Sequence, residues 1–309
     1  MPRSLMLLDT GPGGAGTADS MNLTDTHCHL DFSKFDSDRN SVLERAVQAG
    51  VRRILIPGLT LNSSLSVIKV AESSLMLYAA IGVHPTEAGT WTDTTQKHLT
   101  SLVSSHPHLV SSRGERVGRE RKIVAIGEIG LDYYWDAAPH DLQQCVMKEQ
   151  LDIAAELELP VIIHFRENAL DTVKECASDL LKILEIWVTG LKRDQNPLAK
   201  SPGVLHSFSG TLELAHAVLS LGFFLGVAGP ITYKKNHQQQ ELIASLPLDR
   251  LLLETDAPFQ TPHPHRGKRN EPSYVRLIAD KIACVHSDTT ENVAKVTSEN
   301  ASRLFTWEE

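Results

Sequence analysis

The sequence predicts a single-domain α/β protein built as a (β/α)8 TIM barrel, and three observations support this fold class. Eight short apolar runs alternate along the chain with longer amphipathic segments, and eight is the number of strands in such a barrel. Several of the runs are almost wholly apolar, as expected for strands that are covered on both faces. No GxGxxG motif follows the first run, which argues against a doubly wound open sheet, the competing arrangement.

The predicted elements follow one another in the order that a barrel requires. Strands are expected where an apolar run is short, and helices where apolar residues recur at helical spacing. The predicted strands cover residues 23–29, 53–57, 77–83, 123–128, 160–164, 203–206, 222–225 and 251–254. The predicted helices cover residues 41–50, 61–73, 141–157, 169–184, 212–221, 239–246, 273–285 and 290–305.

Three segments fall outside this alternation. Residues 1–22 contain a glycine-rich run and no periodic pattern, which predicts a disordered extension ahead of a barrel domain over residues 23–309. The connections over residues 110–122 and 186–202 are long. Both are predicted to be surface excursions of one domain.

Composition limits the classes of partner and location. Of 309 residues, 41% are hydrophobic and 22% are charged, as in soluble globular proteins. The net charge of −8 argues against a broad nucleic-acid-binding face, although it permits a small basic patch. No apolar run approaches the length of a membrane span. The four cysteines lie far apart without a CxxC pair or a signal peptide, which predicts free thiols and a cytoplasmic protein. We expect a monomer without an obligate protein partner.

Polar residues follow the predicted strands at the points where those strands end. His27 and His29 form a His-x-His pair, which alone is commonly a surface or packed feature. Other strand ends carry the same types of side chain, and in a barrel these ends converge on one mouth. The full set of predicted ligands is His27, His29, Glu128, His164, His206 and Asp256.

Six ligands exceed the needs of one tetrahedral zinc ion and suit two divalent ions. His27, His29 and Asp256 could hold one ion, His164 and His206 the other, and Glu128 could bridge them. Taken singly, each histidine could be packed, Glu128 could be salt-bridged, and Asp256 could cap a helix. Glu254 shares strand parity with Asp256, which is preferred because it lies nearer the mouth. Four imidazoles favour Zn²⁺ or Mn²⁺ over Mg²⁺, although the sequence does not exclude Mg²⁺.

Motifs over residues 23–305 resemble the TatD-type deoxyribonucleases. This resemblance implies a barrel of the metal-dependent hydrolase superfamily with a two-metal site, and by motif position it implies the same six ligands. On the fourth strand Glu128 stands where related enzymes often have a carboxylated lysine. The motifs are Thr26-His27-Cys28-His29-Leu30-Asp31, Gly82-Val83-His84-Pro85, Gly127-Glu128-Ile129-Gly130-Leu131-Asp132, His164-Phe165-Arg166, His206-Ser207-Phe208-Ser209-Gly210, Glu254-Thr255-Asp256-Ala257-Pro258 and Arg269-Asn270-Glu271-Pro272.

The resulting hypothesis is a metal-dependent deoxyribonuclease that cleaves phosphodiester bonds at the ends of single DNA strands. Two ions would generate a bridging hydroxide that attacks phosphorus, and Asp256 would accept its proton. Arg166 could hold a phosphate oxygen or form a surface salt bridge. His84 could contact the phosphate, donate a proton or be structural.

Aromatic and basic residues near the predicted mouth add weaker expectations. Tyr133 and Tyr134 could stack on a base or could pack in the core. Lys234-Lys235 and Arg266–Arg269 follow the last two strands. They could track a few phosphates or lie in solvated loops.

Two other classes of function remain open at this stage. The same barrel could hydrolyse a carbon ester or amide, as an aminoacyl-tRNA deacylase or a lactonase would. A non-enzymatic metal-binding protein is the other alternative, which a complete ligand set disfavours.

Overall fold

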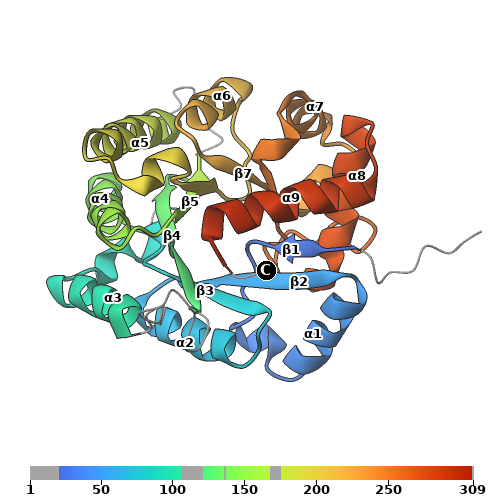
Figure 1. Ribbon diagram of the computed structural model, residues 1–309, viewed down its shortest axis with the longest axis horizontal. Coiled ribbons are helices and arrows are strands. Elements are labelled where there is room, and N and C mark those ends of the chain that lie inside the picture. The colour runs from blue at the N-terminus through green and yellow to red at the C-terminus, as the bar shows by residue number, and fades with distance from the viewer. Residues whose placement is uncertain (1–20, 106–120, 136, 168–174, 308–309) are drawn as a thin grey trace, which may run out of the picture.

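The computed structural model describes residues 21–105, 121–135, 137–167 and 175–307, and it confirms the predicted barrel. Eight parallel strands follow one another in sequence order around a single sheet, and helices surround them (Figure 1). The strands are β1 (Leu23–Asp25), β2 (Val51–Pro57), β3 (Leu77–Ile81), β4 (Ile123–Asp132), β5 (Val161–Arg166), β6 (Gly203–Leu205), β7 (Phe224–Val227) and β8 (Leu251–Leu253).

The helices form the outer ring of the barrel (Figure 1). Among them is α3, which sequence patterning missed because its threonines and serines are poor helix formers. Its buried face consists of Thr95, Leu99 and Val103 at four-residue spacing. The α-helices are α1 (Arg39–Gln48), α2 (Leu61–Glu72), α3 (Asp93–Ser105), α4 (His140–Leu157), α5 (Glu175–Arg193), α6 (Leu212–Ser220), α7 (His237–Ser245), α8 (Val275–His286) and α9 (Thr290–Phe305).

The prediction of a long surface connection over residues 186–202 is wrong for most of these residues. Helix α5 continues to Arg193 because Trp187, Val188 and Leu191 extend its buried face. A short 3-10 helix, Pro197–Lys200, fills much of the remainder. Most of the 110–122 connection and residues 1–20 of the predicted extension lie outside the described residues. Met21 is buried in the core.

The barrel closes between β1 and β8 through segments that continue beyond both strands. The amide of Thr26 donates to the Leu253 carbonyl at 2.9 Å. The Asp256 amide donates to the His27 carbonyl at 2.9 Å, and the His29 amide donates to the Ala257 carbonyl at 2.8 Å. We call these segments, Thr26–His29 and Leu253–Ala257, the closing seam. Closure therefore places two predicted ligand segments side by side.

Helix α9 covers the amino-terminal end of the barrel, opposite the strand ends that carry the predicted site. In Figure 1 it crosses in front of the strands, and the described chain ends near the centre of the view. Leu304, Phe305 and Trp307 belong to the cluster that fills the barrel interior, together with Tyr78 and Phe224. This end is thus closed by packing, which leaves the carboxyl-terminal mouth for ligands. In the part of the chain that the structure describes, no helix is both long and apolar enough to span a membrane.

Two buried glutamines of α4 fasten the ends of neighbouring strands. Gln150 accepts a hydrogen bond from the Val83 amide at 2.7 Å and donates to the Val83 carbonyl at 3.0 Å. Gln143 makes the same pair of bonds to Asp132, at 2.8 and 3.0 Å. Each glutamine side chain thus pairs with the N–H and the C=O of one residue, as a neighbouring strand would. These buried backbone groups therefore have hydrogen-bond partners without water.

Replacing Gln150 by Leu should destabilise the fold by about 2–4 kcal/mol, because both backbone groups of Val83 lose their buried partner. Urea unfolding would measure the difference in the free energy of unfolding. The exposed Gln48→Leu on α1 is the control and should change stability by less than about 0.5 kcal/mol. Equal effects of the two substitutions would contradict this role for Gln150.

Candidate metal centre at the mouth of the barrel

The structure brings all six predicted ligands together at the carboxyl-terminal mouth. Five of them are buried, and the side chain of His164 is 15% exposed. His27 and His29 lie just beyond β1 in the closing seam, and their Nε2 atoms are 3.3 Å apart. Cys28 between them is fully buried in the core and is therefore a packing residue. His164 Nδ1 and His206 Nε2, from β5 and the end of β6, are 3.2 Å apart.

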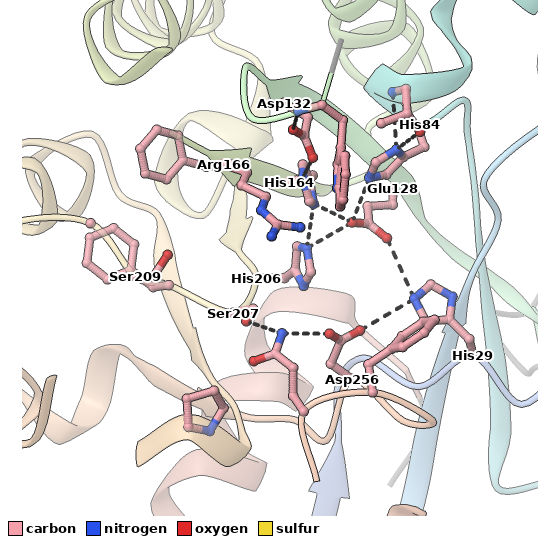
Figure 2. Close-up of a pocket in the computed structure, with 18 of the residues that line it drawn as sticks. His29, His84, Glu128, Asp132, His164, Arg166, His206, Ser207, Ser209 and Asp256 are labelled. Carbon is pink, nitrogen blue, oxygen red and sulfur yellow. Dashed lines mark hydrogen bonds and ion pairs between the residues drawn. The ribbon is translucent and has the colours of Figure 1, made fainter. Parts of the chain in front are cut away.

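Glu128 of β4 lies between these two histidine pairs, and Figure 2 shows its carboxylate between His29 on one side and His164 and His206 on the other. One carboxylate oxygen, Oε2, is 3.2 Å from His27 Nε2 and 3.9 Å from His29 Nε2. The other, Oε1, is 2.9 Å from His164 Nδ1 and 2.8 Å from His206 Nε2. The carboxylate therefore faces one pair with each oxygen, which is the arrangement expected of a bridging ligand.

Asp256 completes the half of the site that contains His27 and His29. Its Oδ1 is 3.5 Å from His29 Nε2 and 3.9 Å from His27 Nε2. Its Oδ2 accepts a hydrogen bond of 2.6 Å from Gln260, whose amide nitrogen is also 2.7 Å from the Ser207 hydroxyl. Gln260 was not singled out from the sequence. It fixes which carboxylate oxygen of Asp256 faces the histidines.

Two further carboxylates orient the histidines of the other half. His164 Nε2 is 2.9 Å from Asp132 Oδ2, which directs Nδ1 of the same ring at Glu128. Glu254 lies 3.7 Å from His206 Nδ1 and accepts a hydrogen bond from the Ser207 amide. A carboxylate behind a histidine ligand fixes the ring orientation and raises its basicity. The only sequence signal for Asp132 was its place in the fourth-strand motif, and Glu254 shared parity with Asp256.

Asp25 supports the closing seam from beneath the site. It accepts hydrogen bonds from the Thr255 amide at 2.9 Å and from the Thr255 hydroxyl at 2.6 Å. Burial raises its pKa to about 8, against the lowering effect of these bonds. The side chain therefore joins the ends of β1 and β8, and it also accepts a hydrogen bond from the His27 amide at 3.3 Å.

The electrostatics of the cluster centre on Glu128. Burial opposes its ionisation, but the neighbouring His206, His27 and His84 outweigh burial and hold its pKa well below the usual range. Within the described residues, its ion-pair partners are all histidines, with no lysine or arginine among them. A buried carboxylate needs a compensating positive charge.

This donor set fits divalent cations. Imidazole nitrogens and carboxylate oxygens of the cluster lie within 4.8 Å of one another in overlapping groups. Close pairs of imidazole nitrogens need a proton or a cation between them, and in the described part of the chain Glu128 has no cationic partner other than histidine. Mixed nitrogen and oxygen ligands suit Zn²⁺ and Mn²⁺ better than Mg²⁺.

A cavity of about 880 Å³ opens over the cluster, and its lining includes His84, Trp135 and Arg166. His84 lies close to the ligands, with its Nε2 3.5 Å from Glu128 Oε1 and its Nδ1 2.7 Å from the Thr86 hydroxyl. The Arg166 guanidinium stacks over the ring of Tyr134 at 4.0 Å and is directed toward the cavity (Figure 2).

Only one of the two predicted stacking tyrosines is exposed. Tyr133 is buried, stacks on His140 with ring centres 3.5 Å apart, and donates a hydrogen bond to Asp179. It is therefore a packing residue. Tyr134 is 44% exposed and its neighbour Trp135 is 54% exposed. Their amides both donate to Asp132, so one carboxylate positions His164 and this aromatic pair.

A barrel with a histidine–carboxylate cluster at its mouth defines the class of metal-dependent hydrolases. The family model described as TatD related DNase matches residues 24–306. The chain belongs to the TatD family and is a metal-dependent hydrolase of that family.

Relatives in bacteria cover almost the whole chain. The uncharacterized metal-dependent hydrolase YabD of Bacillus subtilis is 38% identical, over 92% of this chain and 98% of its own length. The 3'-5' ssDNA/RNA exonuclease TatD of Erwinia tasmaniensis is 33% identical, over 91% and 98%. The crystal structure of YjjV, a TatD homolog from Escherichia coli K12, superposes with a TM-score of 0.78 at 32% identity, over 93% of this chain and 98% of that one.

Divalent ions should stabilise the folded protein, because they would neutralise the Glu128 carboxylate, whose ion-pair partners among the described residues are histidines. Adding Mn²⁺ or Zn²⁺ after chelation, at about a hundredfold excess over Kd, should contribute about 3 kcal/mol and raise Tm by several degrees. Glu128→Gln should remove most of this increase in a thermal unfolding assay.

The matched control is Glu44→Gln on the exposed surface of α1, which should leave the metal-induced shift unchanged. If Glu128→Gln retained the full shift, Glu128 would have no part in metal binding.

Proposed function

We propose that this protein is a metal-dependent exonuclease that removes nucleotides from the ends of single-stranded DNA. The observation that carries the proposal is the two-sided cluster around Glu128 at the floor of a cavity of about 880 Å³. An exposed arginine and two exposed aromatic rings stand beside that cluster. The name of the Erwinia tasmaniensis relative, a 3'-5' ssDNA/RNA exonuclease, supports a nucleic-acid substrate.

The six clustered residues would hold two divalent ions. His27, His29 and Asp256 would bind one ion, His164 and His206 the other, and Glu128 would contact both. Bound ions would ionise a water molecule near neutral pH and neutralise the charge that develops on the phosphoryl oxygens.

Asp256 is proposed to accept the proton of the attacking water. Its Oδ2 is occupied by the hydrogen bond from Gln260, and its Oδ1 faces the histidines. The surrounding charges keep it ionised: burial opposes its charged form, yet the hydrogen bond with His29 and the nearby histidines hold its pKa below the usual value. An ionised and oriented carboxylate is suited to act as a general base.

Arg166 and the aromatic pair are proposed to position the substrate. The Arg166 guanidinium is exposed, stacks on Tyr134, and can bind a phosphate oxygen through its planar fork. Trp135 lines the cavity and offers a face for a base. His84, on the opposite side of Glu128, would contact the phosphate or donate a proton to the leaving group.

The net charge of −8 favours a strand end over a long duplex. A protein that wraps a duplex presents a broad basic face. A single strand end needs only a narrow cavity with a few cationic and aromatic contacts.

Parallel assays on the metal-loaded protein would test this function. We expect single-stranded DNA with a label at one end to be shortened progressively, while acyl esters and lactones stay intact. Cleavage of a carbon ester with no loss of DNA would contradict the exonuclease and favour the ester hydrolase. Addition of a chelator should stop either reaction.

Asp256→Ala should lower DNA hydrolysis by about 10²–10⁴-fold, because the proton acceptor is removed, while part of the bound metal is retained. The measurement combines initial rates with metal content. Asp249→Ala is the control, because Asp249 is exposed ahead of β8, at the far end of the barrel. A rate for Asp256→Ala that matched this control would contradict the proposed role.

A further inference from the structure

A second cavity of about 500 Å³ lies beside the metal centre, and its lining is basic and aromatic. It is formed by the loops that follow β7 and β8. We call it the basic cleft. It is lined by Tyr233, Lys234, Lys235, Asn236, His263 and Arg266. None of these residues is acidic, although acidic residues outnumber basic ones in the chain as a whole, 38 to 30.

The basic cleft and the cavity over the candidate metal centre adjoin at one shared lining residue. Asn236 lines both cavities, and its side chain is held by hydrogen bonds to the Pro230 carbonyl at 3.1 Å and to Gln239 at 2.6 Å. The amide of His263 donates to the Thr232 hydroxyl at 2.8 Å, which fastens the two loops together. A chain that leaves the metal centre on this side would therefore enter a cleft with a defined shape.

The three strong cations of the basic cleft are available to a ligand. Lys234, Lys235 and Arg266 are exposed. No carboxylate of the described residues forms a salt bridge with any of them, within the ion pairs that the structure contains. The Arg266 guanidinium lies 4.0 Å from the centre of the Tyr233 ring, so it is oriented without being neutralised.

Arg269, three residues after Arg266, differs because its charge is paired. Its guanidinium makes two hydrogen bonds to Asp38, at 2.8 and 2.7 Å, and stacks over Phe35. It ties the loop after β8 to the segment before α1. The basic run over residues 266–269 thus contains a structural arginine, Arg269, and an arginine, Arg266, that has no acidic partner among the described residues.

We propose that the basic cleft binds the phosphodiester backbone of a single strand whose end is held at the metal centre. Ammonium and guanidinium groups bind phosphate oxygens, and the Arg266–Tyr233 stack offers a flat surface for a nucleotide. This inference rests on the proposed exonuclease function and adds a substrate class to it. The enzyme should favour oligonucleotides that reach the cleft over dinucleotides and small phosphodiesters, which occupy the metal centre alone.

The test compares the triple variant Lys234→Gln, Lys235→Gln, Arg266→Gln with the wild type, both loaded with metal. The substrates are an oligodeoxythymidylate of about 20 nucleotides, longer than a typical single-strand site, and bis(p-nitrophenyl) phosphate. On the oligonucleotide, kcat/KM should fall on the order of tenfold at physiological salt, mainly through KM. On the small phosphodiester it should be unchanged.

A binding measurement gives a second readout that does not depend on turnover. Fluorescence anisotropy with a phosphorothioate version of the same oligonucleotide would give Kd over a range of salt concentrations. Three lost phosphate contacts should lower the slope of log Kd against log salt concentration by about two.

The control variant is Arg52→Gln, Lys182→Gln, Lys192→Gln, which removes the same charge from exposed positions outside both cavities. Equal effects of the two triple variants on the oligonucleotide would overturn the basic cleft. An equal loss on the small phosphodiester and the oligonucleotide would also overturn it, because the residues would then act on the metal centre. Failure of the exonuclease function would appear differently, as a wild type that cleaves no DNA, and the anisotropy comparison would still decide whether the cleft binds a strand.

Discussion

Closure of the barrel between β1 and β8 is the constraint on which the site depends. A parallel sheet becomes a barrel only if its first and last strands pair, and here that pairing continues beyond the regular strands into the closing seam. Backbone hydrogen bonds join Thr26 to Leu253, His27 to Asp256 and His29 to Ala257. The bonds that close the barrel also set the positions of three proposed ligands, so half of the proposed centre depends on barrel closure. Asp25, buried beneath the seam and bonded to Thr255, reinforces the same junction.

The second constraint is the buried charge of Glu128. A carboxylate with imidazoles on both sides and no lysine or arginine partner among the described residues is costly in a protein without cations. The fold holds this charge in place with further carboxylates behind the histidines, Asp132 behind His164 and Glu254 behind His206. Such an arrangement concentrates negative charge, and it becomes stable when positive charge is supplied from outside the chain. The same feature that would weaken the fold in the absence of ions is the one that suits the centre to bind them.

The sequence was sufficient for the barrel and for bringing the six ligands to one mouth, because both follow from local patterns. Strand ends can be recognised from apolar runs, and parallel strands carry their ends to one side. The positioning residues could not be predicted in the same way. Gln260 donates hydrogen bonds to Asp256, four residues before it, and to Ser207, 53 residues before it, and the contact with Ser207 follows from no local pattern. The sequence pattern did not predict helix α3, because the buried face of this helix includes a threonine. The helix predicted over residues 169–184 ends too early, although Trp187 and Leu191 continue the apolar face of α5.

Local sequence patterns do not predict which basic residues have an acidic partner in the folded protein. Arg266 and Arg269 stand in one short run and are indistinguishable by composition. Tertiary pairing separates them, because Asp38 neutralises Arg269 while Arg266 stacks on Tyr233 and keeps its charge available. In an acidic protein, the cations that can act on a ligand are those without an acidic partner, and the loops at the open end bring three such cations of the described residues together, Lys234, Lys235 and Arg266. The opposite end is closed by α9 and Trp307. Apolar packing thus closes one end of the molecule, and under the proposed function a substrate strand would approach the candidate metal centre from the open end.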